Sequence, residues 1–191
     1  RPMSAPIAVF GYPTWSDIYA VDRLPERPGL MVPGRHVATR LGGGPTHTAC
    51  MLASAGHRVR MFGQVTTGEL GDRLLEELAA RGIEIRGLER ADVEVPRYLS
   101  LITPDGERTI VGWMARPPGP PPTPDPAGLA DCGLLFWPLS TGAYAAAAAR
   151  LRDRAPTRTM VGAWPEPSVE RWPMNVVVAS REELTEEQAS A

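Results

Sequence analysis

The sequence contains no lysine, and all 20 of its basic residues are arginine. A phosphate-binding P-loop and Schiff-base catalysis both need a lysine, so the 191 residues exclude both. Cysteine is scarce as well: Cys50 and Cys132 lie in apolar surroundings and do not have the spacing of a metal site. We therefore expect two buried free thiols and no zinc centre.

Long apolar runs and a charge excess are also missing. No stretch approaches the roughly 20 residues of a membrane-spanning helix, and no signal peptide is recognisable, so we expect a cytoplasmic protein. The formal net charge of −2 argues against a general nucleic-acid binder.

What the chain does contain is an alternation of short apolar strands and helical segments. Such an alternation predicts a mostly parallel sheet covered by helices. The helix expected after the strand at residues 59–65 begins with a capping box, Thr66 to Glu69, and ends at Gly82. The other predicted strands are residues 7–10, 83–88, 133–137, 159–163 and 175–179, and the other helices are residues 45–55, 143–154 and the segment from Ser180 onward.

Four further short strands interrupt this alternation. They are residues 18–21, 35–40, 98–103 and 107–113, the last two joined by a Pro104-Asp105-Gly106 turn. We expect them to form a small second sheet that covers the binding pocket as a lid, built from residues 18–40 and 98–114 of a single domain spanning residues 1–191.

The sequence Gly42-Gly43-Gly44-Pro45 joins a predicted strand to a predicted helix. Glycine leaves no Cβ between the backbone and a ligand, and a helix N-terminus attracts anions and polar oxygens. One interpretation is therefore a ligand-binding turn. The other is a tight strand-to-helix connection without a ligand.

Several motifs, taken in order, resemble the ribokinase-like (PfkB) family of carbohydrate and nucleoside kinases. Asp17 stands where the substrate-binding aspartate of that family follows the first strand, and residues 104–109 are similar to the turn of its lid hairpin. Glu183 stands at the glutamate of its Asn-x-x-Glu motif. The residues similar to its N-terminal signature are Gly42-Gly43, Pro45, Thr48-Ala49, Gly56 and Gly71-Asp72.

The resemblance implies a three-layer α/β/α fold with a small β-sheet lid. It also implies an enzyme that uses ATP and Mg²⁺ and transfers the γ-phosphate of ATP to a hydroxyl of a sugar or nucleoside. The implied partners are that small molecule and a second copy of the chain bound through the lid, with no nucleic acid and no membrane.

The resemblance also implies roles for particular residues. Asp17, Gly42 and Gly43 would hold the hydroxyls of the acceptor, and we predict that His47 and Trp137 also contact it. Glu183 would lie near phosphate and magnesium, and no residue is predicted to bind a metal directly.

Departures from the family pattern support a second hypothesis. His47 replaces the signature asparagine, Thr66 a glycine, and Ser180 the asparagine of Asn-x-x-Glu. The family's Gly-Ala-Gly-Asp loop, which carries the general base, does not occur in the sequence. We therefore expect the base beyond Ala191, with this chain carrying the acceptor half. The alternative is a degenerate, non-catalytic relative that binds a sugar-like or nucleoside-like ligand or a protein partner.

Each candidate residue also has a purely structural interpretation. Asp17 can cap a loop, and His47 can bond to the backbone in the first turn of its helix. Glu183 can complete a capping box with Ser180. Trp137 can belong to the core, as aromatic residues of α/β proteins usually do.

Overall fold

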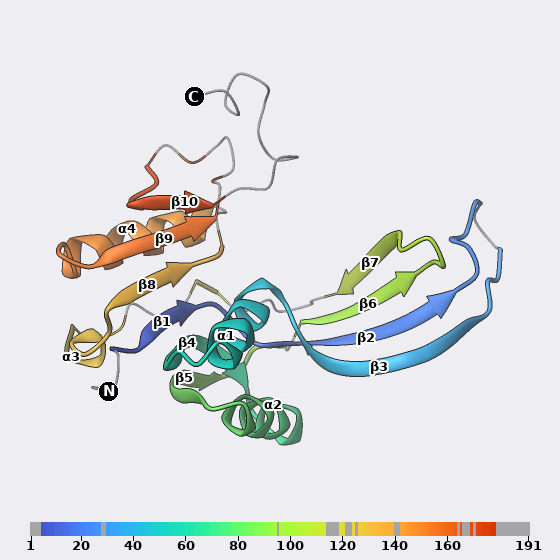
Figure 1. The fold of residues 1–191 in the computed structure, drawn as a ribbon, viewed down its shortest axis with the longest axis horizontal. Helices are drawn as coiled ribbons and strands as arrows, with labels where there is room; N and C mark the ends of the chain where they lie inside the picture. Colours follow the sequence, from blue (N-terminus) through green and yellow to red (C-terminus); the bar gives the residue numbers. More distant parts are fainter. Residues whose placement is uncertain are drawn as a thin grey trace.

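The computed structural model describes residues 5–27, 30–94, 96–113, 119–120, 124, 126–139, 142–163, 165, 169 and 171–178. Six strands form a wholly parallel sheet in the order β10-β9-β8-β1-β4-β5 (Figure 1). This confirms the sheet that the alternation of strands and helices predicted. Its strands are β1 (Ile7–Phe10), β4 (Val59–Thr66), β5 (Ile83–Ala91), β8 (Leu134–Trp137), β9 (Thr159–Ala163) and β10 (Val176–Val178).

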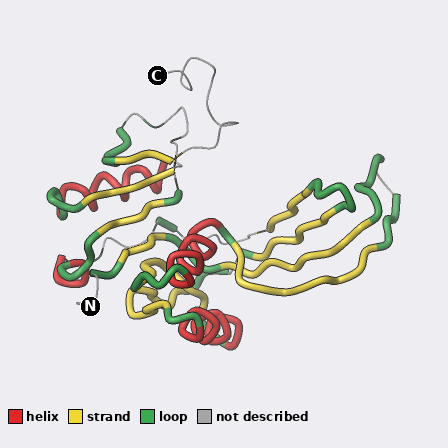
Figure 2. Tube along the Cα trace, in the orientation of Figure 1, coloured by secondary structure: helices red, strands yellow, loops and turns green. Residues whose placement is uncertain are grey.

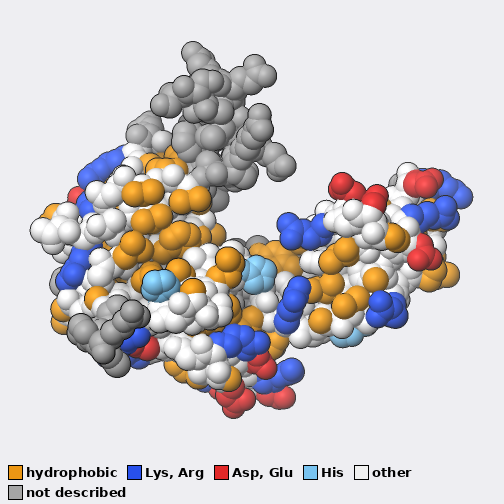
Figure 3. Space-filling model, viewed as in Figure 1, with side chains coloured by type: hydrophobic (Ala, Val, Ile, Leu, Met, Phe, Trp, Pro, Cys, Tyr) orange, Lys and Arg blue, Asp and Glu red, His pale blue; other side chains and the backbone are white. Residues whose placement is uncertain are grey.

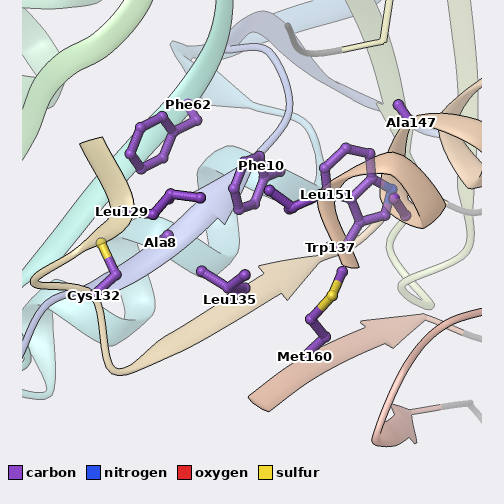
Figure 4. Close-up of a cluster of buried hydrophobic side chains, with 11 residues drawn as sticks. Ala8, Phe10, Phe62, Leu129, Cys132, Leu135, Trp137, Ala147, Leu151 and Met160 are labelled. Carbon is purple, nitrogen blue, oxygen red and sulfur yellow. The ribbon is translucent and has the colours of Figure 1, made fainter. Parts of the chain in front are cut away.

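Helices cover both faces of this sheet and make three layers. Helices α1 (Gly44–Ser54) and α2 (Glu69–Ala80) pack on one face, and α3 (Pro126–Leu129) and α4 (Gly142–Arg154) on the other. Successive side chains of β1 point to opposite faces, so Phe10 joins the α4 core shown in Figure 4. No helix in the described ranges is long and apolar enough to cross a membrane.

One part of the sheet keeps an open apolar face. Val9, Phe136, Val161 and Val176 are successive register partners across β1, β8, β9 and β10, so their side chains point to the same face of the sheet. Val9 packs toward α1 and α2 on this face. Within the described residues no helix covers this face over β9 and β10, where Val176 is 49% exposed. Figure 3 shows hydrophobic side chains gathered over these strands.

The second sheet projects from the body as an arm (Figures 1 and 2). Its order is β3-β2-β6-β7, and β2 pairs with β6 in parallel, whereas the other two pairs are antiparallel. The predicted second sheet is therefore present. Its strands are β2 (Thr14–Val21), β3 (Gly34–Gly42), β6 (Arg97–Ile102) and β7 (Arg108–Trp113).

Two local expectations are wrong. The strand expected at residues 18–21 begins earlier, at Thr14, because β3 and β6 supply hydrogen-bonding partners on both sides of residues 14–17. The capping box from Thr66 does not form. Thr66 ends β4, and α2 begins at Glu69 with Gly68 at the N-cap and no side-chain capping bond.

One charged side chain lies inside the body. Arg60 of β4 is 1% exposed, and its guanidinium donates to Asp131 at 2.7 and 2.8 Å and to Glu84 at 2.8 Å. A buried charge is stable only when it is paired and hydrogen-bonded in this way. These bonds tie β4 and β5 to the segment that follows α3.

A contact between bare backbones joins the end of β1 to its neighbours. A Cβ on Gly63 of β4 would lie 1.8 Å from the carbonyl oxygen of Gly11, and a Cβ on Gly11 would lie 2.4 Å from Cγ of Pro45 in α1. Gly11 has a φ of +145° and donates its N–H to the Phe62 carbonyl at 2.9 Å. The chain leaves the parallel sheet here and enters β2.

We expect Gly63→Ala to lower the free energy of unfolding by about 2–3 kcal/mol, since its methyl group would displace backbone rather than a flexible side chain. The matched control is Gly142→Ala at the start of α4, where a Cβ would meet nothing within 4 Å. Urea unfolding followed by circular dichroism measures both. Equal stabilities of the two variants would contradict the backbone contact.

Candidate functional site

The Gly42-Gly43 turn brings the start of α1 against β2. A Cβ on Gly42 would lie 2.0 Å from Oγ of Ser16, and one on Gly43 would lie 3.0 Å from Oγ1 of Thr14. Gly43 has a φ of +82° and is the N-cap of α1, with no side-chain capping bond. Gly42 therefore packs against Ser16, and Gly43, the residue before the helix, packs against Thr14. We call Ser16, Gly42 and Gly43 the cradle.

Asp17 lies on the other face of β2 from the cradle. Consecutive residues of a strand point to opposite faces. The Asp17 carboxylate accepts hydrogen bonds from the Thr39 hydroxyl at 2.6 Å and from the Arg97 guanidinium at 3.0 Å. It borders a cavity of about 550 Å³ together with Leu99 and other apolar side chains. The structure therefore does not bring Asp17 together with Gly42 and Gly43.

The pKa of Asp17 lies below its ordinary value, chiefly because the Thr39 hydroxyl donates a hydrogen bond to the carboxylate. Partial burial raises this pKa, and the hydrogen bond and positive charge of Arg97 lower it further. His36 Nε2 lies 3.0 Å from the same Thr39 hydroxyl. Both carboxylate oxygens of Asp17 thus have partners from neighbouring strands, and the carboxylate helps to hold β2, β3 and β6 together.

Three tyrosines that the sequence analysis did not single out gather beside the cradle. The rings of Tyr12 and Tyr144 are 6.4 Å apart, and the phenols of Tyr98 and Tyr144 are close enough to Tyr12 to influence its pKa. Burial, followed by the neighbouring phenols, raises the pKa of Tyr12 and of Tyr144. Tyr98 lies beside Ser16, its register partner in β2.

Two buried threonine hydroxyls flank the turn. Thr14 and Thr46 are both 0% exposed, and neither Oγ1 atom has a hydrogen-bond partner among the described residues. Unpaired buried hydroxyls are costly, and native proteins usually satisfy them. The region between β2 and the start of α1 is therefore more polar than its apolar surroundings.

The other two residues predicted to contact the acceptor, His47 and Trp137, lie in different surroundings, one exposed and one buried. His47 is exposed on the first turn of α1, and its backbone N–H donates to the Gly43 carbonyl at 2.9 Å. Trp137 is 2% exposed and packs against Phe10, with their ring centroids 4.9 Å apart. A contact between Trp137 and a ligand would require this ring to leave the core.

The phosphate end of the predicted site lies outside the described residues, because Glu183 and Ser180 both belong to the undescribed C-terminal segment. Among the residues that the structure does describe, no three His, Cys, Asp or Glu side chains are grouped so that they could hold a metal ion. Of the predicted site, the described residues therefore include the cradle and not the phosphate end.

Comparison with known proteins agrees with this arrangement. A family model described as pfkB family carbohydrate kinase matches residues 6–115, which include the Gly42-Gly43 turn and all four strands of the second sheet. The chain belongs to the pfkB carbohydrate kinase family. Gly71, one of the residues similar to the family signature, allows α2 to pack closely on the end of β4, because a Cβ there would lie 2.0 Å from the Thr66 carbonyl oxygen.

Solved structures of kinases have the same fold. The ribokinase from Thermotoga maritima is 14% identical to this chain, with a TM-score of 0.71. The match covers 94% of this chain and 60% of the ribokinase chain. The ADP complex of ribokinase from Cryptococcus neoformans var. grubii is 25% identical, with a TM-score of 0.64 and coverages of 86% and 52%. The ATP complex of fructokinase from Xylella fastidiosa is 16% identical, with a TM-score of 0.62 and coverages of 86% and 55%. The pfkB chain described here thus spans little more than half of each of these proteins.

We expect Asp17→Asn to lower the free energy of unfolding by about 1 kcal/mol at pH 7, because the charged bonds to Thr39 and Arg97 are weakened. A carboxylate with a depressed pKa stabilises the fold above its ordinary pKa, and the effect disappears as the pH falls through the folded-state pKa. The difference between wild type and variant should therefore close as the solution is acidified below about pH 4.

Urea unfolding at pH 7, 5 and 3 measures this difference. Asp153→Asn is the matched control, since the Asp153 side chain is 61% exposed and bonds to an exposed Arg171. A wild-type-to-variant gap of the same size at all three pH values would show that the Asp17 charge does not stabilise the fold.

Proposed function

We propose that the protein is a kinase that transfers the γ-phosphate of ATP to a hydroxyl of a sugar or nucleoside. This chain would supply the acceptor half of that site. The observation that carries the proposal is the cradle: Gly42 packs against the Ser16 side chain, and Gly43 holds the start of α1 against Thr14 of the same strand.

The cradle suits an acceptor that carries several hydroxyls. A serine hydroxyl can donate and accept, and the free N–H groups at the start of α1 donate to ligand oxygens. A ligand can approach the partly exposed backbone of Gly43 closely because this residue has no Cβ, whereas Ser16 fills the Cβ position of Gly42. Asp17, predicted to take two sugar hydroxyls, remains a candidate contact. Both carboxylate oxygens of Asp17 already accept hydrogen bonds, and the side chain lies on the opposite face of β2 from the cradle. Ser16 is therefore closer than Asp17 to a ligand bound in the cradle.

The second sheet would act as the lid of this site. Its face with Ser16, Gly42 and Tyr98 lies toward Tyr12 at the end of β1, whose pKa Tyr98 influences. Closing this face over an acceptor would exclude water, which would otherwise compete as the phosphate acceptor.

The family and the nucleotide-bound relatives support ATP as the phosphate donor. Mg²⁺ would neutralise the phosphate charge in such a transfer, and one or two carboxylates together with the phosphates usually hold it. Glu183 stays a predicted neighbour of phosphate and magnesium. The general base is expected outside these residues, so no proton-transfer step is assigned to this chain.

A second candidate function is a family member that binds a sugar-like or nucleoside-like ligand, or a protein, without catalysis. The observation that favours it is His47, which occupies the first turn of α1, next to the cradle, where the family signature has asparagine. Ligand binding without phosphate transfer would distinguish this function from the first.

The decisive experiment measures ATP-dependent phosphorylation of D-ribose, D-fructose and adenosine by the protein with its full natural sequence. We expect Gly42→Ala to raise the acceptor KM or Kd at least about tenfold, because its methyl group collides with Ser16. Gly44→Ala is the matched control, since a Cβ there meets nothing within 4 Å. Equal acceptor binding by the two variants would overturn the cradle, and binding without turnover would favour the second function.

We also propose that two copies associate through the outer face of the second sheet, the face that carries Asp17. This face is largely apolar around the cavity of about 550 Å³ that Asp17 and Leu99 border. Val111, opposite Leu99 in the register, is 48% exposed. Exposed apolar surface of this kind favours burial against a partner.

We expect Val111→Asp to convert a dimer into a monomer, as measured by light scattering during size-exclusion chromatography. Ile110→Asp is the control, because Ile110 is equally exposed at 49% but points to the opposite face. A monomeric wild-type protein, or dimers of both variants, would contradict this interface.

A further inference from the structure

We propose that Tyr12, Tyr98 and Tyr144 form an aromatic wall that receives the ring of a cyclic acceptor and makes the site prefer a sugar or nucleoside ring over an open-chain polyol. This inference rests on the proposed function, because it assigns further side chains to the same acceptor site.

The wall combines side chains from three separate parts of the fold. Tyr12 follows Gly11 at the carboxyl end of β1, Tyr144 lies in the first turn of α4, and Tyr98 belongs to β6 of the second sheet. The rings of Tyr12 and Tyr144 are 6.4 Å apart and inclined at 55°, and the phenols of Tyr98 and Tyr144 both interact electrostatically with Tyr12. The Tyr144 hydroxyl donates to the Gly119 carbonyl at 3.1 Å. This bond restricts the orientation of the Tyr144 ring.

Tyr98 connects this wall to the cradle. Its register partner in β2 is Ser16, whose hydroxyl faces Gly42, and neighbouring strands lie about 4.8 Å apart. Its register partner in β7 is Gly112, where a Cβ would lie 2.8 Å from two atoms of the Tyr98 ring. The glycine therefore makes room for the ring to lie across β7, on the same face as Ser16.

The chemistry of the wall suits a ring that has both an apolar face and hydroxyl groups. Aromatic faces pack on the C–H face of a sugar ring or stack on a base, and each phenol can donate and accept a hydrogen bond. Tyr12, Tyr98 and Tyr144 are all half-buried, so each retains surface that a ligand can reach. An open-chain polyol can fill the hydroxyl contacts of the cradle but presents no flat face to the rings.

The test is isothermal titration of the full protein with two probe classes. The cyclic probes are D-ribose and adenosine, and the open-chain probe is ribitol. We expect wild type to bind a cyclic probe more tightly than ribitol. Tyr98→Ala should weaken cyclic binding at least about tenfold and ribitol binding by less than about threefold. Tyr98→Phe, which keeps the ring, should retain the preference for cyclic probes.

Gly112→Ala gives an independent variant, because its methyl group displaces the Tyr98 ring without altering any phenol. It should behave as Tyr98→Ala does. Tyr19→Ala is the matched control: Tyr19 lies on the outer face of the same sheet, edge-on to His36 with ring centroids 5.2 Å apart, and its loss should leave the cyclic preference unchanged.

If the variants fail to fold, the wild-type protein alone still decides the question. Binding of D-ribose or adenosine should perturb the tyrosine absorption near the red edge of its band, and binding without any perturbation would overturn the wall. Unchanged cyclic preference in folded Tyr98→Ala and Gly112→Ala would overturn this inference alone. A wild-type protein that binds none of the probes would overturn both the inference and the acceptor site on which it rests.

Discussion

The arrangement of the whole molecule depends on a close contact between bare backbones at the end of β1. Gly63 approaches the Gly11 carbonyl, and Gly11 approaches Pro45, so closely that side chains at either glycine would force the strands apart. Parallel strands and the start of a helix can converge here only because both residues lack a Cβ. The chain leaves the six-stranded sheet at this point, which places β2, and with it the second sheet, over the start of α1.

The two-residue period of β2 then decides what the site contains. Ser16 and Asp17 are neighbours in sequence, yet Ser16 faces Gly42 while Asp17 bonds to Thr39 and Arg97 on the outer face. Shifting the register by one residue would exchange them. The register is held by partners 22 and 80 residues away, so it cannot be inferred from the local sequence around Gly11.

The second sheet joins the body through buried apolar side chains. Trp15 of β2 and Leu41 of β3 are register partners, and both are 5% exposed. They belong to the same core cluster as Val9 of β1 and Ala49 of α1. This packing fixes the inner end of the second sheet against α1.

The sequence by itself determined the class of fold, most strands of both sheets and the glycine turn, because local periodicity and turn residues carry that information. The family followed from the resemblance of its ordered motifs. The sequence predicted neither the burial of Arg60 between Glu84 and Asp131, nor the core position of Trp137, nor the gathering of three tyrosines. Those features depend on residues that are far apart along the chain. Only the tertiary structure decided that Ser16, rather than Asp17, faces Gly42. The reason is that strand register pairs residues that are far apart in the chain, and the local sequence around each residue does not specify its partner.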